Sequence, residues 1–214
     1  FMNLGAAIGA MVGVGASTVT AMELGKKNYA KSCRALANTI MLNIIFGILF
    51  TVICLLFLKP ILYFFGASDQ TLPYAFEYMQ VILLGNIITH LYHGLNSVLR
   101  ASGHPNEAMI ATIITVIANI FLDWLFIYPL GMGIRGAAIA TVLAQTLPLI
   151  YLIKIFSNKN ELVHFDKKDF IFDIKIIKDM LAIGLSPFLL NTALCVIIIL
   201  INKGLKEFGG DLSV

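Results

Sequence analysis

The chain contains 214 residues, of which 59% are hydrophobic and only 13% are charged, and its 15 Lys and Arg against 12 Asp and Glu give a net charge of +3. Soluble domains are about 45–50% apolar and about 25% charged, so this composition leaves too few charges to coat a water-facing surface. It excludes a soluble enzyme, a nucleic-acid-binding domain and a disordered linker, and it predicts an integral membrane protein.

Six apolar stretches in the sequence are long enough to cross a lipid bilayer. A transmembrane helix needs about 20 mostly apolar residues, because the hydrocarbon core is about 30 Å thick. The strands of a membrane β-barrel alternate over about ten residues, whereas these stretches are longer and uniformly apolar. The sequence therefore predicts an all-α, polytopic membrane helix bundle with six transmembrane helices. These are expected over residues 1–22, 35–58, 72–98, 109–129, 136–155 and 181–201.

The basic residues are distributed unequally between alternate loops. Eleven Lys and Arg residues lie in or beside the first, third and fifth loops, and four lie in the second and fourth loops and the C-terminal tail. Because cytoplasmic loops carry an excess of Lys and Arg, the basic loops are predicted to face the cytoplasm and both chain ends the outside. The chain opens inside an apolar stretch, without a basic leader or a cleavable signal peptide. We therefore expect it to be part of a longer transporter-like protein, with further helices on both sides.

The fifth loop divides the chain. Phe170, Ile174, Ile177 and Leu181 recur there at spacings of four, three and four residues, and Lys and Asp fill most of the other positions. This spacing is typical of an amphipathic helix that lies at the membrane surface. We expect four regions, which are a first lobe of transmembrane helices (1–156), a cytoplasmic linker with an amphipathic helix (157–180), the first helix of a second lobe (181–203) and an extracytoplasmic loop (204–214).

Asp123 is the most informative residue, because it is a carboxylate inside the fourth apolar stretch. A charged side chain there costs on the order of 2.5–3.5 kcal/mol and usually has a functional role inside the bundle. Thr112, Thr115, Asn119 and Asp123 are spaced by three, four and four residues, so they share one face of a helix. Such a stripe supplies either oxygen ligands for Na⁺ or a protonatable carboxyl with hydrogen-bonding neighbours. The alternative is that Thr and Asn bond to adjacent helices and that Asp123 anchors the outer end of its helix.

Other polar residues within the apolar stretches have less specific patterns. Thr141 and Gln145 share a face of the fifth helix, and Thr141 taken alone favours bonding between helices over a ligand role. His90 and His93 have a spacing that could hold a metal ion, but no third ligand accompanies them. The lining of a polar cavity or hydrogen bonding at a helix interface is the favoured interpretation of this pair.

The remaining patterns concern packing and the absence of enzyme motifs. Gly5, Gly9 and Gly13 recur every four residues, which predicts close helix packing.

The three cysteines give neither a disulfide framework nor paired metal-ligand spacing. The sequence contains no Ser/His/Asp grouping, zinc-protease motif, P-loop or CxxC motif. We therefore predict that the protein is not an enzyme and that any transport is driven by an ion gradient or by energy supplied from elsewhere.

Several motifs, taken in chain order, resemble those of multidrug and toxic compound extrusion (MATE) transporters. They are residues 13–17 with 23–28, 99–108 (LRASGHPNEA), 119–123 (NIFLD), 131–141 (GMGIRGAAIAT) and 205–211 (LKEFGGD). The resemblance implies a fold of twelve helices in two lobes, of which this chain supplies helices two to seven. It also implies secondary active antiport, in which Na⁺ or H⁺ enters while a drug or organic cation is exported.

The same resemblance implies which residues couple ion entry to export. In the bacterial damage-inducible branch of the family, the motif positions of the first-lobe ion or proton site fall on Asn119, Asp123 and Thr141, and the polar network around them includes Tyr78 and Asn96. No cofactor is implied, and no metal other than Na⁺ as a coupling ion at the first three residues. The implied partners are a small organic cation or toxic compound, the lipid bilayer of the bacterial inner membrane and the remainder of the transporter, with no nucleic acid.

Two other functions are compatible with parts of the sequence. A lipid-linked oligosaccharide flippase of related architecture needs a large cationic groove, for which the sequence offers Arg100 and scattered basic loop residues. A structural membrane subunit would use Asp123 to pair helices. Dependence of activity on Na⁺, on pH and on Asp123 separates the antiporter from both.

Overall fold

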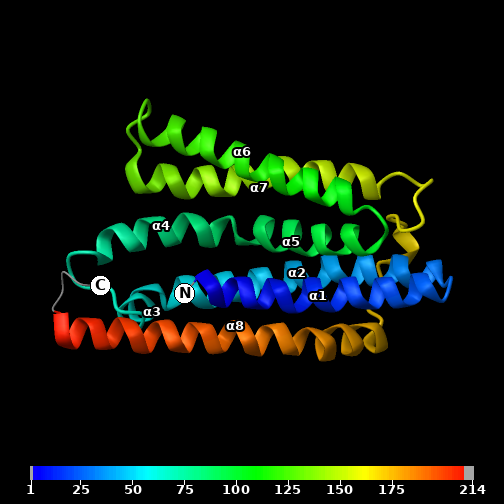
Figure 1. The fold of residues 1–214 in the computed structure, drawn as a ribbon, viewed down its shortest axis with the longest axis horizontal. Helices are drawn as coiled ribbons and strands as arrows, with labels where there is room; N and C mark the ends of the chain where they lie inside the picture. The colour runs from blue at the N-terminus through cyan, green and yellow to red at the C-terminus, as the bar shows by residue number, and fades with distance from the viewer. Residues whose placement is uncertain (1, 210–214) are drawn as a thin grey trace.

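The computed structural model describes residues 2–209, and its ordered elements are all helical (Figure 1). The predicted all-α helix bundle is thereby confirmed. The elements in chain order are α1 (Met2–Gly25), α2 (Tyr29–Leu56), α3 (Leu58–Phe64), α4 (Leu72–Leu84), α5 (Asn86–Ala101), α6 (Pro105–Ile127), α7 (Gly133–Phe156), the 3₁₀ turn η1 (Lys167–Asp169) and α8 (Ile174–Gly209). Of the segment 204–214 that we expected to be a loop, 204–209 continues α8, and 210–214 lies outside the described residues.

Within the described residues, the helices α1, α2, α6, α7 and α8 are each long and apolar enough to cross a membrane. The expected span 72–98 is instead divided between α4 and α5, which lie end to end and meet at Gly85 (Figure 1). Neither helix alone reaches the roughly 20 residues that a membrane span needs, so the two together replace one predicted helix. The expected loop 59–71 also contains most of the short helix α3.

Two hydrogen bonds tie the junction of α4 and α5 to α2, and one of them satisfies a backbone carbonyl at the junction. Thr51 Oγ1 of α2 donates a hydrogen bond of 3.0 Å to the Leu83 carbonyl oxygen, and Asn86 Nδ2 donates one of 3.5 Å to the Gly47 carbonyl oxygen. A Cβ atom at Gly85 would overlap a side chain of α7, so glycine allows the junction to pack closely there. The break is tolerated at membrane depth because the polar groups around it stay bonded.

The helices α1, α2 and α5 form the centre of the bundle, with α8 along α1 and with α6 and α7 on the far side of α5 (Figure 1). Cβ atoms added to the three evenly spaced glycines of α1 would each lie 3.2–3.5 Å from a side chain of α2 or α5. The predicted close packing at these glycines is therefore confirmed. The contacts join Gly5 to Phe50, Gly9 to His90 and Gly13 to Ser97.

The antiparallel helices α1 and α8 touch through two reciprocal glycine contacts. A Cβ atom on Gly15 would overlap the Met180 carbonyl oxygen, and a Cβ atom on Gly184 would overlap the Met11 carbonyl oxygen. Small residues that bring two backbones into contact are the usual means of tight helix association in membranes. The first turns of α8 are thus fixed directly against the backbone of α1.

The segment that we expected to be a separate amphipathic helix becomes, from Ile174 onward, the beginning of α8. Its buried positions are Ile176, Met180 and Gly184, which recur every four residues on the side that meets α1. Ile174, a member of the predicted apolar stripe, is exposed. The buried face is therefore determined by the contact with α1 and differs from the stripe read from the sequence.

Asn38 of α2 fixes the end of the linker. Its Nδ2 donates a hydrogen bond of 3.1 Å to the Ile171 carbonyl oxygen, and its Oδ1 accepts one of 3.2 Å from the Asp173 backbone N–H. The Arg34 guanidinium lies 3.8 Å from the Asp169 carboxylate and 3.9 Å from that of Asp173. The Asp173 carboxylate also accepts hydrogen bonds from backbone N–H groups in the first turn of α8. The starting point of α8 is thereby tied to α2.

We expect Asn38→Ala to lower the free energy of unfolding by about 1–3 kcal/mol, because it removes a fully buried amide and leaves its two backbone partners in the linker unpaired. Limited proteolysis of the purified complete protein should show faster cleavage within 157–173, together with a lower Tm. Asn158→Ala is the matched control, since Asn158 is exposed and its side chain bonds only to the nearby Asn160 N–H. Equal cleavage of Asn38→Ala and the wild-type protein would contradict this role for Asn38.

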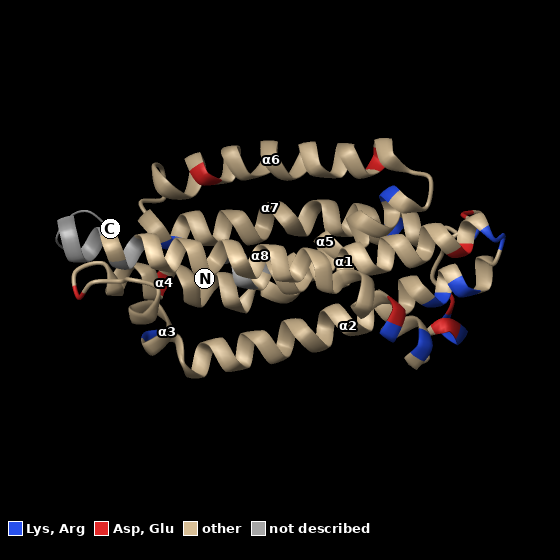
Figure 2. Ribbon diagram, turned by 60° about the horizontal axis from the view of Figure 1, so that its bottom comes forward, with Lys and Arg blue, Asp and Glu red and all other residues tan. Residues whose placement is uncertain are grey.

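Most Lys and Arg residues gather at one end of the bundle, where α1 ends, α2 begins and the linker runs (Figure 2). Some of them pair with nearby acids there, as Lys26 does with Glu23 at 3.0 Å and Lys168 with Asp166 at 2.9 Å. We call this the basic end, and it is the end for which the loop charges predict a cytoplasmic position. Asp123 lies toward the opposite end, four residues before α6 finishes.

Candidate ion-coupling site

Asn119 and Asp123 lie one helical turn apart on α6, and both are half-buried. The atoms Asn119 Nδ2 and Asp123 Oδ1 are buried and have no hydrogen-bond partner within the described residues 2–209. A buried polar group without a partner costs about 1–3 kcal/mol, and more when it is charged. Two such groups on one face of a membrane helix therefore form a candidate site for a polar ligand.

Thr141 of α7 lies at the same depth as this pair. α6 and α7 are antiparallel neighbours, and Gly136 packs so closely on Phe126 that an added Cβ atom would lie 3.0 Å from the Phe126 Cβ. Thr141 follows Gly136 by five residues on α7. Because α6 runs in the opposite direction, the same level on α6 lies five residues before Phe126, which is between Asn119 and Asp123. The Thr141 hydroxyl donates to a carbonyl oxygen of its own helix at 3.0 Å, so the hydroxyl oxygen can still accept or ligate.

The other two residues of the predicted stripe bond to α5. Thr115 Oγ1 donates a hydrogen bond of 3.0 Å to Tyr92 Oη, and Asn96 Nδ2 donates one of 3.2 Å to Thr112 Oγ1. Asn96 Nδ2 also lies 3.2 Å from Tyr92 Oη. The half of the stripe nearer the basic end thus joins a polar network between α5 and α6, in which Asn96 Oδ1 is the one buried side-chain atom without a partner within residues 2–209. In the half described above, neither Asn119 Nδ2 nor Asp123 Oδ1 has a partner there.

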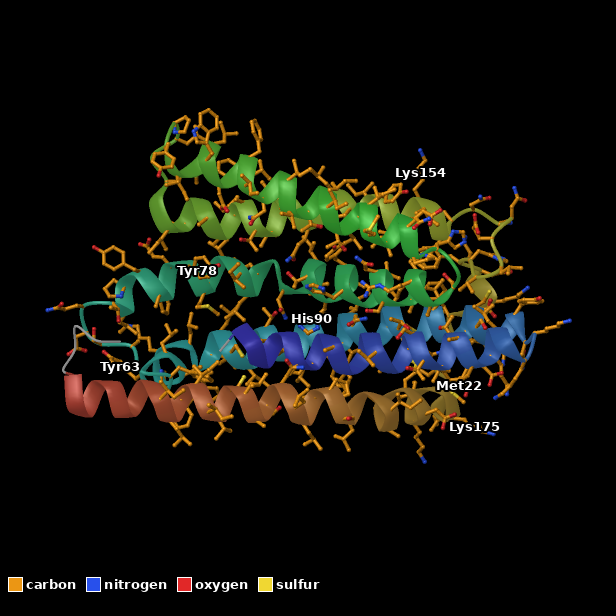
Figure 3. All side chains as sticks on the ribbon, viewed as in Figure 1. Met22, Tyr63, Tyr78, His90, Lys154 and Lys175 are labelled. Carbon is orange, nitrogen blue, oxygen red and sulfur yellow. The ribbon has the colours of Figure 1, made fainter. Side chains whose placement is uncertain are left out.

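The two residues that we expected around the ion site lie at different places in the bundle. Asn96 belongs to the network just described, and its partner Thr112 precedes Asp123 by eleven residues, which is about 16 Å of helix. Tyr78 lies on α4 (Figure 3), where it packs on a buried apolar cluster. The structure therefore places Asn119, Asp123 and Thr141 at one depth, with Asn96 nearer the basic end. The cluster under Tyr78 consists of Cys54, Leu58, Leu62, Met79 and Leu83.

Thr89 and Tyr92 of α5 carry polar contacts that the sequence analysis did not single out. The Thr89 hydroxyl donates a hydrogen bond to Gln145 Oε1 of α7, and Tyr92 is shared between two partners in the network with α6. Tyr92 stands four residues before Asn96, so the helical spacing could have identified it as a neighbour. The polar face of α7 that contains Thr141 therefore also meets α5 through Gln145.

His90 and His93 point to different surroundings, because His90 is buried at 2% exposure and His93 is exposed. Within residues 2–209, no three His, Cys, Asp or Glu side chains are placed to hold a metal ion. The cysteines Cys33, Cys54 and Cys195 are free and buried.

Comparison with known proteins gives relatives along most of the chain. The family model MatE matches residues 1–125. The multidrug export protein MepA of Staphylococcus haemolyticus is 30% identical over 203 residues, which cover 95% of this chain and 45% of that protein. MepA of Staphylococcus aureus is 27% identical over 202 residues, which cover 94% of this chain and 45% of that protein. The chain thus spans about half the length of the curated relatives that it matches.

Solved structures contain the same arrangement of helices. An inward-facing conformation of a multidrug resistance MATE family transporter of the MOP superfamily superposes with a TM-score of 0.92 and 29% identity, over 99% of this chain and 48% of that one. An outward-facing conformation of a transporter described in the same way gives a TM-score of 0.88 and 28% identity, over 98% and 47% of the two chains. The multi-pass bundle therefore corresponds to half of such a transporter. With the family model matching more than half of its residues, the chain belongs to the MatE family.

Proposed function

We propose that the complete protein is a secondary active antiporter that exports drugs or organic cations in exchange for Na⁺ or H⁺, and that this chain supplies ion-coupling residues. The observation that carries the proposal is the pair of unpartnered buried atoms on Asn119 and Asp123, at the depth of Thr141. The relatives named as multidrug export proteins support the class of substrate. Because the chain spans about half of their length, the transport cycle belongs to the longer protein.

The three side chains are suited to either coupling ion. The Asp123 carboxylate, the Asn119 amide oxygen and the Thr141 hydroxyl are oxygen ligands of the kind that hard cations prefer. In the proton-coupled alternative, the Asp123 carboxyl takes up the proton, and the unpartnered Asn119 amide N–H₂, one helical turn away, is a donor that the ionised form can use. Asp123 thus alternates between an ion-bound or protonated state and a free carboxylate.

This alternation can drive transport only if the two conformations of the transporter bind the ion with different affinity. Binding of a cation or proton removes the uncompensated charge of Asp123 from the interface between α6 and α7, which changes the packing that this interface favours. In the two-lobed architecture, rocking of the lobes then exposes the substrate cavity to each side of the membrane in turn.

The test is to express the complete transporter in efflux-deficient bacteria and to follow export of a fluorescent organic cation, such as ethidium, under imposed Na⁺ and pH gradients. We expect export that stops when the driving gradient is collapsed. Export that is insensitive to both gradients would contradict the antiporter. No export from well-folded, full-length protein would favour the lipid-linked oligosaccharide flippase instead.

We further infer that the ion site is of the type expected for the damage-inducible branch, in which Asn119, Asp123 and Thr141 hold the coupling ion. The relatives described above carry the name MepA, so this branch assignment depends on whether the three residues bind the ion. Separate Asn119→Ala and Thr141→Ala variants should each raise the Na⁺ or H⁺ concentration that gives half-maximal export. Unchanged ion dependence in both variants would count against the assignment.

A further inference from the structure

The turn between α5 and α6 fixes the position of His104. Gly103 has a φ of 97°, in the left-handed region that favours glycine, and it reverses the chain. The His104 backbone N–H then donates a hydrogen bond of 3.2 Å to the Leu99 carbonyl oxygen. Pro105 begins α6, at a position where a residue without an N–H is tolerated. His104 is therefore held by the backbone on both sides, and its side chain is half-buried.

The linker that follows α7 reaches this turn at the basic end (Figure 1). Val163 of the linker is 2% exposed and belongs to the main apolar core. The Phe165 backbone N–H donates a hydrogen bond of 2.7 Å to the Phe156 carbonyl oxygen at the end of α7. The first part of the linker is thus packed on the bundle, and it brings Glu161 to His104.

His104 lies between two carboxylates that come from different elements. Its Nε2 is 2.8 Å from Glu161 Oε2 in the linker, and its Nδ1 is 3.4 Å from Glu107 Oε1 in the first turn of α6. The side chains of His104, Glu107 and Glu161 are 29%, 38% and 28% exposed, so water reaches all three. The imidazole therefore joins the linker to the first turn of α6, and it can exchange a proton with water.

Protonation decides whether both of these contacts are attractive. A neutral imidazole with its proton on Nε2 donates to Glu161 and turns the lone pair of Nδ1 toward the Glu107 carboxylate. The other neutral tautomer donates to Glu107 and turns its lone pair toward Glu161. Only the imidazolium donates to both carboxylates, and its charge also offsets the repulsion between them.

Other charged groups near this contact do not pair with it. Within residues 2–209, no ion pair joins them to His104, Glu107 or Glu161. Arg and Lys keep their charge between pH 5 and 8, whereas histidine changes its charge in this range. His164, whose Nδ1 lies 2.9 Å from the Glu161 carbonyl oxygen, is the second histidine to consider. The titratable or charged side chains of the adjoining elements are Cys33 on α2, Arg100 on α5, Lys154 on α7, and Lys159, His164 and Asp166 in the linker.

We propose that His104, Glu107 and Glu161 form a pH-dependent clamp, in which protonated His104 pairs with both carboxylates and holds the linker against the start of α6. The docked linker binds the proton more tightly than the free linker does, so protonation favours docking. The clamp is therefore closed at acidic pH and opens as the pH rises through the range in which histidine loses its proton. The proton comes from water and returns to it.

The clamp restrains the segment that connects α7 to α8. A movement of α8 relative to α7 requires this segment to move, so a closed clamp opposes it. The loop charges predict that the basic end faces the cytoplasm, and acidification of the cytoplasm should accordingly slow export. This consequence for export rests on the proposed antiport, whereas the pH-dependent docking of the linker does not.

Hydrogen–deuterium exchange of the complete transporter in lipid nanodiscs tests the clamp directly. The backbone N–H groups of Glu161 and Phe165 are hydrogen-bonded in the docked linker and report on it. After correction for the intrinsic pH dependence of exchange, we expect their protection to fall about threefold to fivefold between about pH 5.5 and 8. His104→Gln should abolish this dependence, and Glu161→Gln, which tests the same contact from the linker, should remove most of it.

His164→Gln is the matched control, because it removes the other histidine and leaves His104 and both carboxylates in place. We expect this variant to keep the pH dependence of the wild-type protein. Protection that is independent of pH in the wild-type protein, or that still depends on pH in His104→Gln, would overturn the clamp. Loss of the dependence in His164→Gln but not in Glu161→Gln would assign the effect to His164 and would overturn it as well.

Export measurements test the consequence for transport. At a constant driving gradient, acidification of the cytoplasmic side from about pH 7.5 to 6 should slow wild-type export about twofold more than export by His104→Gln. Equal slowing of the two proteins would overturn the restraint on export. Wild-type export that needs no gradient would instead count against the proposed antiport, and the exchange measurement would still decide the clamp.

Discussion

Asp123→Asn is expected to leave the complete transporter folded and to reduce gradient-driven export by about 100-fold or more. Asparagine has nearly the same shape as aspartate, but it cannot be protonated in this pH range and has no charge with which to attract a cation. A 100-fold loss corresponds to about 2.7 kcal/mol of coupling free energy, which is within the usual range for coupled sites. Because Asp123 Oδ1 is buried without a partner, removal of its charge should leave Tm unchanged or slightly raised.

Initial export rates in proteoliposomes, at matched protein levels and with imposed Na⁺ or pH gradients, measure this effect. Asp69→Asn is the matched control, since it makes the same chemical change in an exposed residue that accepts a hydrogen bond of 2.7 Å from the Tyr63 hydroxyl. That bond can persist with an amide oxygen, so we expect wild-type export from the control. Wild-type export from Asp123→Asn would place the coupling residue elsewhere in the transporter.

The membrane spans could be predicted from the sequence because length and hydropathy alone nearly determine them. The break at Gly85 could not, since the apolar stretch continues across it and the two hydrogen bonds at the junction are made with α2. The start of α8 was missed for a related reason. Its buried face is selected by Gly15 of α1 and its first residue is positioned by Asn38 of α2, and neither contact leaves a periodic signal in the linker.

The polar stripe on α6 shows which part of the candidate site the sequence could provide. The spacing of Thr112, Thr115, Asn119 and Asp123 predicts a shared face, but it does not specify which neighbours that face meets. Tyr92 and Asn96 of α5 occupy only the half near the basic end. His90 and His93 give a similar example. The sequence pattern does not distinguish the two histidines, but in the structure His90 is buried and His93 is exposed.

Gly184→Ala is expected to destabilise the complete transporter by about 1–3 kcal/mol, with a Tm lower by several degrees. The added methyl group would overlap the Met11 carbonyl oxygen, which is a backbone atom and cannot rotate away as a side chain can. The helices α1 and α8 would have to separate at Gly184. This separation would also break the reciprocal contact between Gly15 and Met180. Gly184→Leu should enlarge the effect and release the first turns of α8 from α1.

Gly204→Ala provides a control on the same helix, because an added Cβ atom there meets no atom within 4 Å. Alanine is the better helix former by about 1 kcal/mol, so we expect the Tm of this control to be unchanged or higher. The same difference in helix propensity favours Gly184→Ala, which means that any loss of stability in that variant comes from the contact with Met11. If both alanine variants melt at or above the wild-type temperature, α1 and α8 are not held together at Gly184, and the first turns of α8 can move independently of α1.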